Sequence, residues 1–384
     1  MNAYRTVILA SRDPTAWLRS GGQLTRHSSV SLLVVLTTLL VMLLIQPLPA
    51  PSVAAVRVPG EDAAGMVSLQ GATPGEGPIG QEEFAGLVEI DGGRRMYLEC
   101  RGWGSPTVVL EAGYGNRADI WSVDLFEPEG SRPMVFPAVA SFARVCAYDR
   151  PGTIGNINPV YSPLAEGDPS LRSRSDPVPM PRTAQDIVAD LHALLHAAGV
   201  PGPYVLVGHS LGGPIVRLYA SAYPDEVAGL VFVDSAHEEQ NAQLAALLSP
   251  AQWVNFHQLQ QSTPPEWAWY PDFERVDFDA SFVQLGQART KWPLRSMPLA
   301  VLTAGRSDDV PIPDWPADAF VRMWRAMQDD LASLVPNARH SIASRSGHYI
   351  HQEQPALVIE AIRQVVTGVR DRDTWFDLAS CCAS

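Results

Sequence analysis

Basic residues are in the minority in this 384-residue chain, which carries 28 lysines and arginines against 41 aspartates and glutamates. The formal net charge is -13 at pH 7, and no run of lysines or arginines interrupts this acidic balance. Because proteins bind nucleic acids through positively charged surfaces, nucleic acid is excluded as an expected partner. The sequence also lacks internal repeats, a P-loop and a dinucleotide-binding fingerprint, so it gives no indication of a repeat architecture or of nucleotide chemistry.

A long apolar run is present only near the N-terminus, where residues 31–45 contain nothing but apolar or hydroxyl side chains. Four arginines precede it, a pattern typical of an export signal or a signal anchor. Residues 1–49 are therefore predicted to be a cleaved signal peptide or an uncleaved membrane anchor; a buried core helix is the competing interpretation. Residues 50–84, rich in Ala, Pro and Gly, are predicted to be a flexible linker. Both signal interpretations predict a membrane-anchored or exported protein with its folded domain outside the cytoplasm.

The remaining sequence alternates between short apolar runs and amphipathic stretches. Strands are predicted at residues 87–90, 96–98, 107–110, 145–148, 204–207, 230–233, 299–302 and 340–343. Helices are predicted after Thr183, after Gly212 and around residues 358–366, where apolar residues recur at helical spacing. This alternation predicts an α/β fold, with a mostly parallel sheet covered by helices on both faces. Ligands bind such sheets at the carboxyl ends of the strands.

The same pattern of strands and helices predicts the domain organisation. Residues 85–370 are predicted to form the folded domain, and residues 371–384 a C-terminal tail. The segment 236–297 lies between two predicted strands and is too long and too aromatic for a simple turn. We expect it to form a helical cap that excludes water and shapes an acyl pocket.

The most informative motif is Gly208–Gly212, which reads Gly-His-Ser-Leu-Gly and directly follows the apolar run 204–207. A G-x-S-x-G sequence between a strand and a helix is typical of a nucleophile elbow. In such an elbow the glycines permit a tight turn and the serine hydroxyl is exposed at the end of the sheet. Ser210 is therefore the predicted nucleophile of an acyl-transfer or hydrolytic reaction.

A serine hydroxyl needs a base to take its proton, and the base needs an acid to orient it. His348 follows the last predicted strand and is the predicted base, with His351 as an alternative. His209 and His196 are expected to be structural. Asp308, on the loop after strand 299–302, is the predicted acid. Asp234, at the end of the preceding strand, and Asp309 remain alternatives.

Two backbone N–H groups are needed to stabilise the oxyanion. Leu211 follows the nucleophile and should supply one of them. Tyr114, in the glycine turn after strand 107–110, should supply the other. Asp149 is expected to pair locally with Arg150 in another turn. No metal and no cofactor are expected.

These motifs make the chain resemble the α/β-hydrolase superfamily. The resemblance rests on Glu111–Gly115, Tyr148–Gly152, Gly208–Gly212 and Gly347-His348, in that order, and covers residues 87–368. It implies an eight-stranded sheet with the second strand antiparallel and a cap after the sixth strand. The chain is most similar to the capped esterase-like, lipase-like and iminopeptidase-like enzymes. The turn at Glu111 reads Glu-Ala-Gly where many members have His-Gly, so a lipase substrate does not carry over.

The resemblance implies a serine hydrolase that cleaves a carboxylic ester or a related small-molecule acyl substrate through a Ser-His-Asp mechanism. An aminopeptidase or amidase of the iminopeptidase type is the alternative; it needs an acidic group for the substrate amine, and Glu238, Glu239, Glu266 and Asp272 are candidates. A catalytically silent binding protein on the same fold is the alternative outside enzymes. A serine at position 210 argues against the epoxide hydrolase and dehalogenase branches, which use an aspartate there.

The strand order that the resemblance implies also places Cys100 next to Cys146. Neighbouring strands lie about 4.8 Å apart, which suits a disulfide if both side chains share a face. A disulfide would persist in an oxidising compartment. Two buried free thiols are the alternative.

Overall fold

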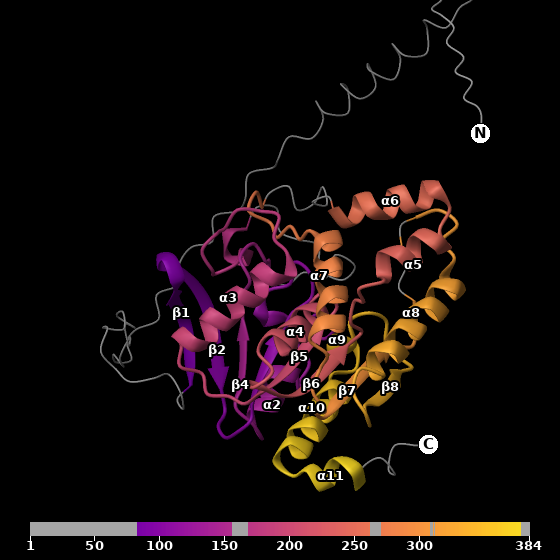
Figure 1. Ribbon diagram of the computed structural model, residues 1–384. Helices are drawn as coiled ribbons and strands as arrows, with labels where there is room; N and C mark the ends of the chain where they lie inside the picture. The colour runs from indigo at the N-terminus through magenta and orange to yellow at the C-terminus, as the bar shows by residue number, and fades with distance from the viewer. Residues whose placement is uncertain (1–82, 156–167, 262–269, 308–309, 311, 378–384) are drawn as a thin grey trace, which may run out of the picture. The chain divides into compact units, whose positions relative to one another are not determined.

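The computed structural model describes residues 83–155, 168–261, 270–307, 310 and 312–377. Eight strands in this part form one sheet in the order β1-β2-β4-β3-β5-β6-β7-β8 (Figure 1). The strands are β1 (Phe84–Ile90), β2 (Arg94–Arg101), β3 (Thr107–Glu111), β4 (Val145–Tyr148), β5 (Tyr204–His209), β6 (Val227–Val233), β7 (Leu299–Ala304) and β8 (Arg339–Ala343). Only β2 pairs antiparallel with its neighbours, and the pairings from β4 to β8 are parallel. The predicted α/β fold, with a mostly parallel sheet and an antiparallel second strand, is confirmed.

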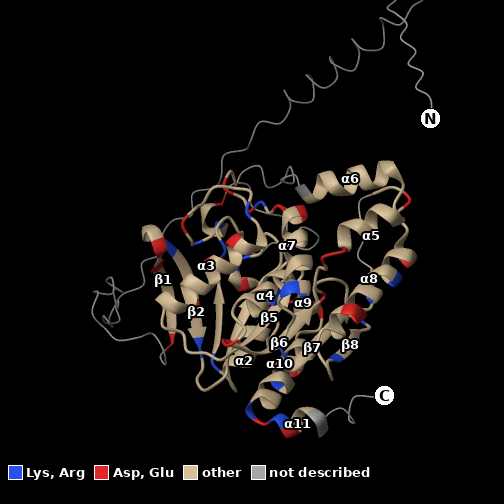
Figure 2. Cartoon of the chain, viewed as in Figure 1, with Lys and Arg blue, Asp and Glu red and all other residues tan. Residues whose placement is uncertain are grey.

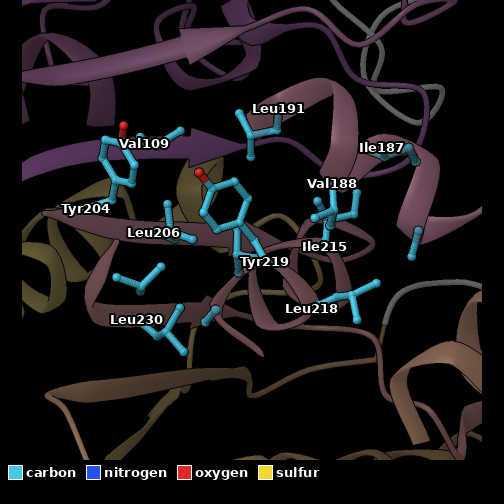
Figure 3. Close-up of a cluster of buried hydrophobic side chains, with 14 of the residues drawn as sticks. Val109, Ile187, Val188, Leu191, Tyr204, Leu206, Ile215, Leu218, Tyr219 and Leu230 are labelled. Carbon is cyan, nitrogen blue, oxygen red and sulfur yellow. The ribbon is translucent and has the colours of Figure 1, made fainter. Parts of the chain in front are cut away.

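Helices cover both faces of the sheet. They are α2 (Val135–Ala140), α3 (Ala184–Ala197), α4 (Gly212–Ala222), α5 (Gln240–Leu247), α6 (Pro250–Gln261), α7 (Phe278–Lys291), α8 (Ala317–Ala332), α9 (Ile350–Glu353), α10 (Pro355–Arg370) and α11 (Arg372–Asp377). One apolar core joins α3 and α4 to the sheet, and a second joins α2 and α10 to it. Figure 3 shows side chains of the first core, among them Leu191 of α3, Tyr219 of α4 and Leu206 of β5.

The start of α3 shows how local sequence sets these elements. The Asp186 side chain accepts a hydrogen bond from the backbone N–H of Thr183, and the Thr183 side chain accepts one from the N–H of Asp186. This reciprocal capping box satisfies two N–H groups that a helix start leaves unpaired. Ile187 and Leu191 then fall on the buried face of the helix. The predicted helix after Thr183 is therefore present.

The connections on either side of β7 carry four of the described helices. The one between β6 and β7 contains α5, α6 and α7, within the predicted cap segment 236–297. The one between β7 and β8 contains α8, which the sequence analysis does not predict. Met327 and Leu331 are buried on one face of α8, and Figure 2 shows acidic and basic positions together elsewhere on that helix. The helix thus has the amphipathic pattern typical of a surface element.

Cys100 and Cys146 form a disulfide between β2 and β4, with their Cα atoms 4.1 Å apart. The two cysteines face one another directly in the antiparallel register. Both side chains are buried in the core on the α3 side of the sheet. The predicted pairing is therefore confirmed, and the free-thiol alternative is wrong for this structure.

The N-terminal predictions concern residues outside the described ranges. Residues 1–49 and most of the predicted linker 50–84 are among these, so the signal or anchor remains a prediction. Among the helices that the structure does describe, none combines the length and apolarity needed to cross a bilayer. At the other end, α11 occupies the first part of the predicted tail 371–384. Trp375 packs α11 against the rest of the domain. Its side chain is buried, and its indole N–H donates to the Asn337 carbonyl at 3.0 Å.

Candidate active site

Ser210 lies between the end of β5 and the start of α4, with a φ of 53°. A non-glycine residue in this left-handed region is strained and needs support from its surroundings. Its backbone N–H donates to the Val233 carbonyl at 3.2 Å, and its carbonyl accepts from the Ala236 N–H at 3.0 Å. A side chain at Gly208 would collide with the Gly212 backbone, so the turn requires glycine there. The local geometry is that of the predicted nucleophile elbow.

His348 follows β8, and its imidazole contacts a buried aspartate. Its Nδ1 atom lies 2.7 Å from Oδ2 of Asp234, which directly follows β6. The other oxygen, Oδ1, accepts hydrogen bonds from the Ala304 N–H at 2.8 Å and the Trp324 indole N–H at 2.9 Å. Because Nδ1 is engaged with Asp234, Nε2 is the imidazole nitrogen suited to exchange a proton with a serine hydroxyl.

The carboxylate beside His348 is not Asp308, the residue that the sequence predicts as the acid. Asp234, an alternative there, is the carboxylate that contacts His348. Asp308 and Asp309 lie outside the described residues. The strand order explains the contact. Strand β6 lies next to β5, which carries the Ser210 elbow, and is separated from β8 only by β7. An acid at the carboxyl end of β6 is therefore close both to the Ser210 elbow and to the His348 loop that follows β8. Asp234 also has a positive φ of 42°, which marks a tight backbone turn at this end of the strand.

Two further histidines lie beneath His348, and neither is suited to act as the base. His351 is fully buried against Trp121, with ring centroids 4.7 Å apart. Burial lowers its pKa to about 3, which keeps the ring neutral. His209 is also buried, and its Nε2 lies 2.9 Å from the His348 carbonyl oxygen. His209 therefore supports the backbone of the loop that carries His348, consistent with its predicted structural role.

The predicted oxyanion donors lie beside the serine. Tyr114 and Leu211 line the same cavity as Ser210 and His348. Within the described part of the chain, no hydrogen-bond acceptor faces the backbone N–H of Tyr114 or Leu211. Both groups are therefore available to an oxyanion, as the chemistry requires.

A buried ionic network holds the Tyr114 turn in place, and sequence reasoning missed it. The Arg150 guanidinium donates to the carbonyls of Ala112 at 2.8 Å and Gly113 at 2.7 Å. It also pairs with Glu111 and with Glu274, whose Oε1 lies 2.6 Å from Nε. The second Glu274 oxygen accepts from the Gly115 N–H at 2.7 Å. The turn is thus fixed on both sides of Tyr114.

The expected local pair of Asp149 and Arg150 does not form. Asp149 instead pairs with Arg174, at 2.7 Å, and Arg150 points toward the glutamates. Although burial opposes its charge, the carboxylates of Glu274 and Glu111 raise the pKa of Arg150. Burial raises the pKa of Glu111. No local signal could reveal the contact with Glu274, which lies 124 positions away in the sequence.

The cavity over Ser210 has a volume of about 300 Å³. Its wall is mainly aliphatic and aromatic and comes from the connections on both sides of β7: Leu244, Phe256, Phe278, Trp315, Phe320, Val321 and Trp324. Asp234 is the one carboxylate among the described residues that line it. Such a lining suits an apolar group placed next to the serine.

The chain is similar to several known proteins. Residues 108–361 match the family described as the Alpha/beta hydrolase family. The chain is 26% identical over 276 residues to the uncharacterized protein YqjL of Bacillus subtilis, covering 72% of this chain and 89% of that protein. It is 27% identical over 218 residues to the lipase LipV of Mycobacterium tuberculosis, covering 52% and 82%. Among solved structures it is similar to mouse alpha/beta hydrolase domain-containing protein 10, with a TM-score of 0.49, 16% identity and coverage of 74% and 99%.

The eight-stranded sheet and the serine elbow at its carboxyl edge define the class of this protein. The chain belongs to the alpha/beta hydrolase family. Membership supports a hydrolase that acts on a small molecule.

Proposed function

We propose that this protein is a serine hydrolase that cleaves a carboxylic ester or a related acyl substrate. One observation carries the proposal: Ser210, in a strained elbow, lines the same cavity as His348, whose Nδ1 is held by Asp234 at 2.7 Å. A serine, a histidine and a carboxylate in these roles form the catalytic arrangement of acyl transfer on this fold. Asp234 replaces Asp308 as the acid in this proposal.

The mechanism follows from the roles of the three side chains. The Ser210 hydroxyl attacks the substrate carbonyl while His348 Nε2 takes its proton, and the N–H groups of Tyr114 and Leu211 stabilise the oxyanion. The tetrahedral intermediate expels the alcohol, which receives the proton from His348, and an acyl-serine remains. A water molecule then attacks the acyl-serine as His348 takes its proton. Collapse of the second intermediate releases the carboxylic acid and returns the proton to Ser210. Asp234 stabilises the imidazolium in both steps.

The lining of the cavity favours an ester over an aminoacyl substrate. An iminopeptidase needs an acidic group for the substrate amine, and Asp234, already paired with His348, is the one carboxylate among the described lining residues. Of the acidic candidates, Glu238 is paired with Arg217 and Arg289. Asp272 lines a different cavity, and Glu239 is not among the described residues that line the cavity over Ser210. Glu266 lies outside the described residues. The aliphatic and aromatic wall supports a substrate with an apolar acyl or alcohol part.

A fluorophosphonate probe and a substrate panel test the proposal. The probe should label the wild-type protein and fail to label Ser210→Ala, because labelling requires an activated serine. The purified protein should hydrolyse p-nitrophenyl esters faster than aminoacyl anilides. Faster anilide cleavage would support the peptidase alternative. Absence of labelling would support the silent binding protein.

We also propose that the domain works outside the cytoplasm, exported or anchored through residues 1–49. The disulfide between Cys100 and Cys146 supports this, because such bonds persist in oxidising compartments. A variant lacking residues 1–50 should remain active but stay in the cytoplasm on cell fractionation. Unchanged location of this variant would contradict the proposal.

A further inference from the structure

Two histidines and a glutamate lie close together at the amino ends of the parallel strands, the end of the sheet opposite the candidate active site. His192 and His196 are one turn apart on α3 and therefore project from the same face of the helix. Glu226 directly precedes β6, at the amino end of that strand. Its Oε1 atom lies 3.2 Å from Nε2 of His192 and 3.0 Å from Nε2 of His196. Each residue contributes one possible ligand atom, and all of these atoms lie within 4.8 Å of one another.

The glutamate is held firmly in this position. The Tyr219 hydroxyl donates to Glu226 Oε2 at 2.6 Å, which leaves Oε1 turned toward the histidines. The Glu226 backbone N–H donates to the Tyr223 carbonyl at 3.1 Å, and its carbonyl accepts from the Tyr204 N–H at 2.7 Å. Outer contacts of this kind orient metal ligands and raise the affinity of a site.

The first histidine is held as well. The His192 ring stacks on Tyr223, with centroids 3.8 Å apart and an angle of 11° between the planes. Its side chain and that of Glu226 are about three-quarters buried, at 28% and 25% exposure, whereas His196 is exposed. The cluster is thus open to solvent on one side, which gives an ion a route of entry.

Two of the three separations between the ligand atoms match the ligand shell of a tetrahedral metal ion. Zinc binds imidazole nitrogen and carboxylate oxygen at about 2.0–2.1 Å, which places two ligands about 3.3 Å apart at the tetrahedral angle. The separations between Glu226 Oε1 and the two imidazole nitrogens, 3.2 Å and 3.0 Å, are close to this value, and the two nitrogens lie within 4.8 Å of each other. Both imidazole nitrogens already lie beside Glu226 Oε1. Little rearrangement is therefore needed for an ion to bind between His192, His196 and Glu226.

We propose that His192, His196 and Glu226 bind a divalent transition-metal ion of the zinc class, with water in the fourth position. Two imidazoles and one carboxylate form a donor set that suits zinc rather than magnesium or calcium, which prefer oxygen ligands. This assigns His196 a role beyond the structural one expected from the sequence, which also predicted no metal.

The ion would link two separate parts of the domain. The histidines belong to α3, and Glu226 belongs to the turn between α4 and β6. Ser210, Asp234 and His348 follow the carboxyl ends of their strands, whereas Glu226 precedes the amino end of β6. The site is therefore separate from the proposed chemistry, and its role would be to stabilise the fold. A ligand that binds only the native state raises the free energy of unfolding.

Calorimetric titration of the chelator-treated full chain with ZnCl₂ tests the site. We expect one saturable site, and His192→Gln and Glu226→Gln should each weaken zinc binding by about 100-fold, since each removes a ligand. His257→Gln is the matched control: His257 is another partly exposed histidine beside a carboxylate, 3.2 Å from Asp279. It should leave the affinity unchanged. Absence of saturable binding, or equal affinity in the wild type and the ligand variants, would overturn the proposal.

Two further measurements keep the test decisive if a ligand variant folds poorly. Tyr219→Phe keeps the buried ring and removes only the hydroxyl that orients Glu226, so zinc affinity should fall by about tenfold. Zinc should raise the unfolding temperature of the wild type and of His257→Gln but not that of His192→Gln. An equal rise in all three would place the ion elsewhere. Esterase activity is measured separately, so failure of the proposed function would leave the zinc result unaffected.

Discussion

The indole N–H of Trp324 donates a 2.9 Å hydrogen bond to Oδ1 of Asp234, the aspartate whose other oxygen holds His348. Trp324 also lines the cavity over Ser210. One side chain of α8 therefore contributes both to the acid of the proposed triad and to the wall of the substrate pocket.

Trp324→Phe should lower kcat by about tenfold, because a hydrogen bond to a charged group contributes about 1.5–3 kcal/mol and part of it is lost in the transition state. Steady-state kinetics on a p-nitrophenyl ester measure the change, and the effect should appear more in kcat than in KM. Trp292→Phe is the matched control, since Trp292 is 55% exposed. An unchanged kcat in Trp324→Phe would show that the bond does not position Asp234.

Asp234→Asn should reduce kcat by about 10⁴-fold, because the amide cannot hold the correct histidine tautomer or stabilise its cation. Asp308→Asn should remain within a few-fold of the wild type. Parallel measurement of kcat in both variants decides which residue is the acid. The reverse pattern would return the role to Asp308.

Ser210→Ala should abolish hydrolysis without unfolding the protein, and His348→Ala should be about as severe. Losses of triad members commonly reach about 10⁶-fold in kcat, and the double variant should be hardly worse because the residues act as a unit. Circular dichroism checks the fold, and progress curves check turnover. Multiplicative losses in the double variant would contradict a shared mechanism.

Glu274→Gln should lower the free energy of unfolding by about 3 kcal/mol, because it removes one partner of the buried Arg150 and leaves part of a charge uncompensated. The kcat should fall too, since the Gly115 N–H loses its carboxylate acceptor beside Tyr114. Urea titration and ester kinetics measure the two effects. Glu360→Gln, at an exposed position, should change stability by less than about 0.5 kcal/mol. Equal effects of the two substitutions would mean that the network does not support the turn.

Replacing both Cys100 and Cys146 with alanine should lower the free energy of unfolding by up to about 4 kcal/mol, because the bond closes a loop with a sequence separation of 46. Urea titration with and without reducing agent provides the control. Reductant should destabilise the wild type and leave the variant unaffected. Two alkylated thiols at these positions in exported protein, seen by mass spectrometry, would contradict the bond.

The elements that sequence predicted well depend on local patterns. The elbow at Ser210 is predicted because glycines follow an apolar strand, and the position of His348 because it comes after the last strand. The pairing of Cys100 with Cys146 followed from the strand order that the family resemblance implied, and the register places them opposite one another.

The features that sequence missed depend on side-chain direction and on long-range contacts. Asp234 and Asp308 follow neighbouring strands, and nothing local indicates which carboxylate reaches His348. Arg150 and Glu274 meet only after the chain has folded. Helix α8 is different, because Phe320, Trp324, Met327 and Leu331 recur at helical spacing. This amphipathic pattern is typical of a helix, so the sequence alone was sufficient to predict α8.

The register between β5 and β6 has a consequence for how this enzyme could change its substrate. His209 pairs with Val233, so Ser210 and Asp234 emerge side by side from two strands joined by backbone hydrogen bonds. Their separation is set by the sheet and is independent of the connection between β7 and α8. That connection carries no member of the proposed triad. Its first residues, Gly305 and Arg306, donate to the Ser346 carbonyl and so hold the loop that carries His348, but the residues after them can vary while the reacting groups stay in place. Loop exchange there offers a route to new specificity, in natural divergence or by design.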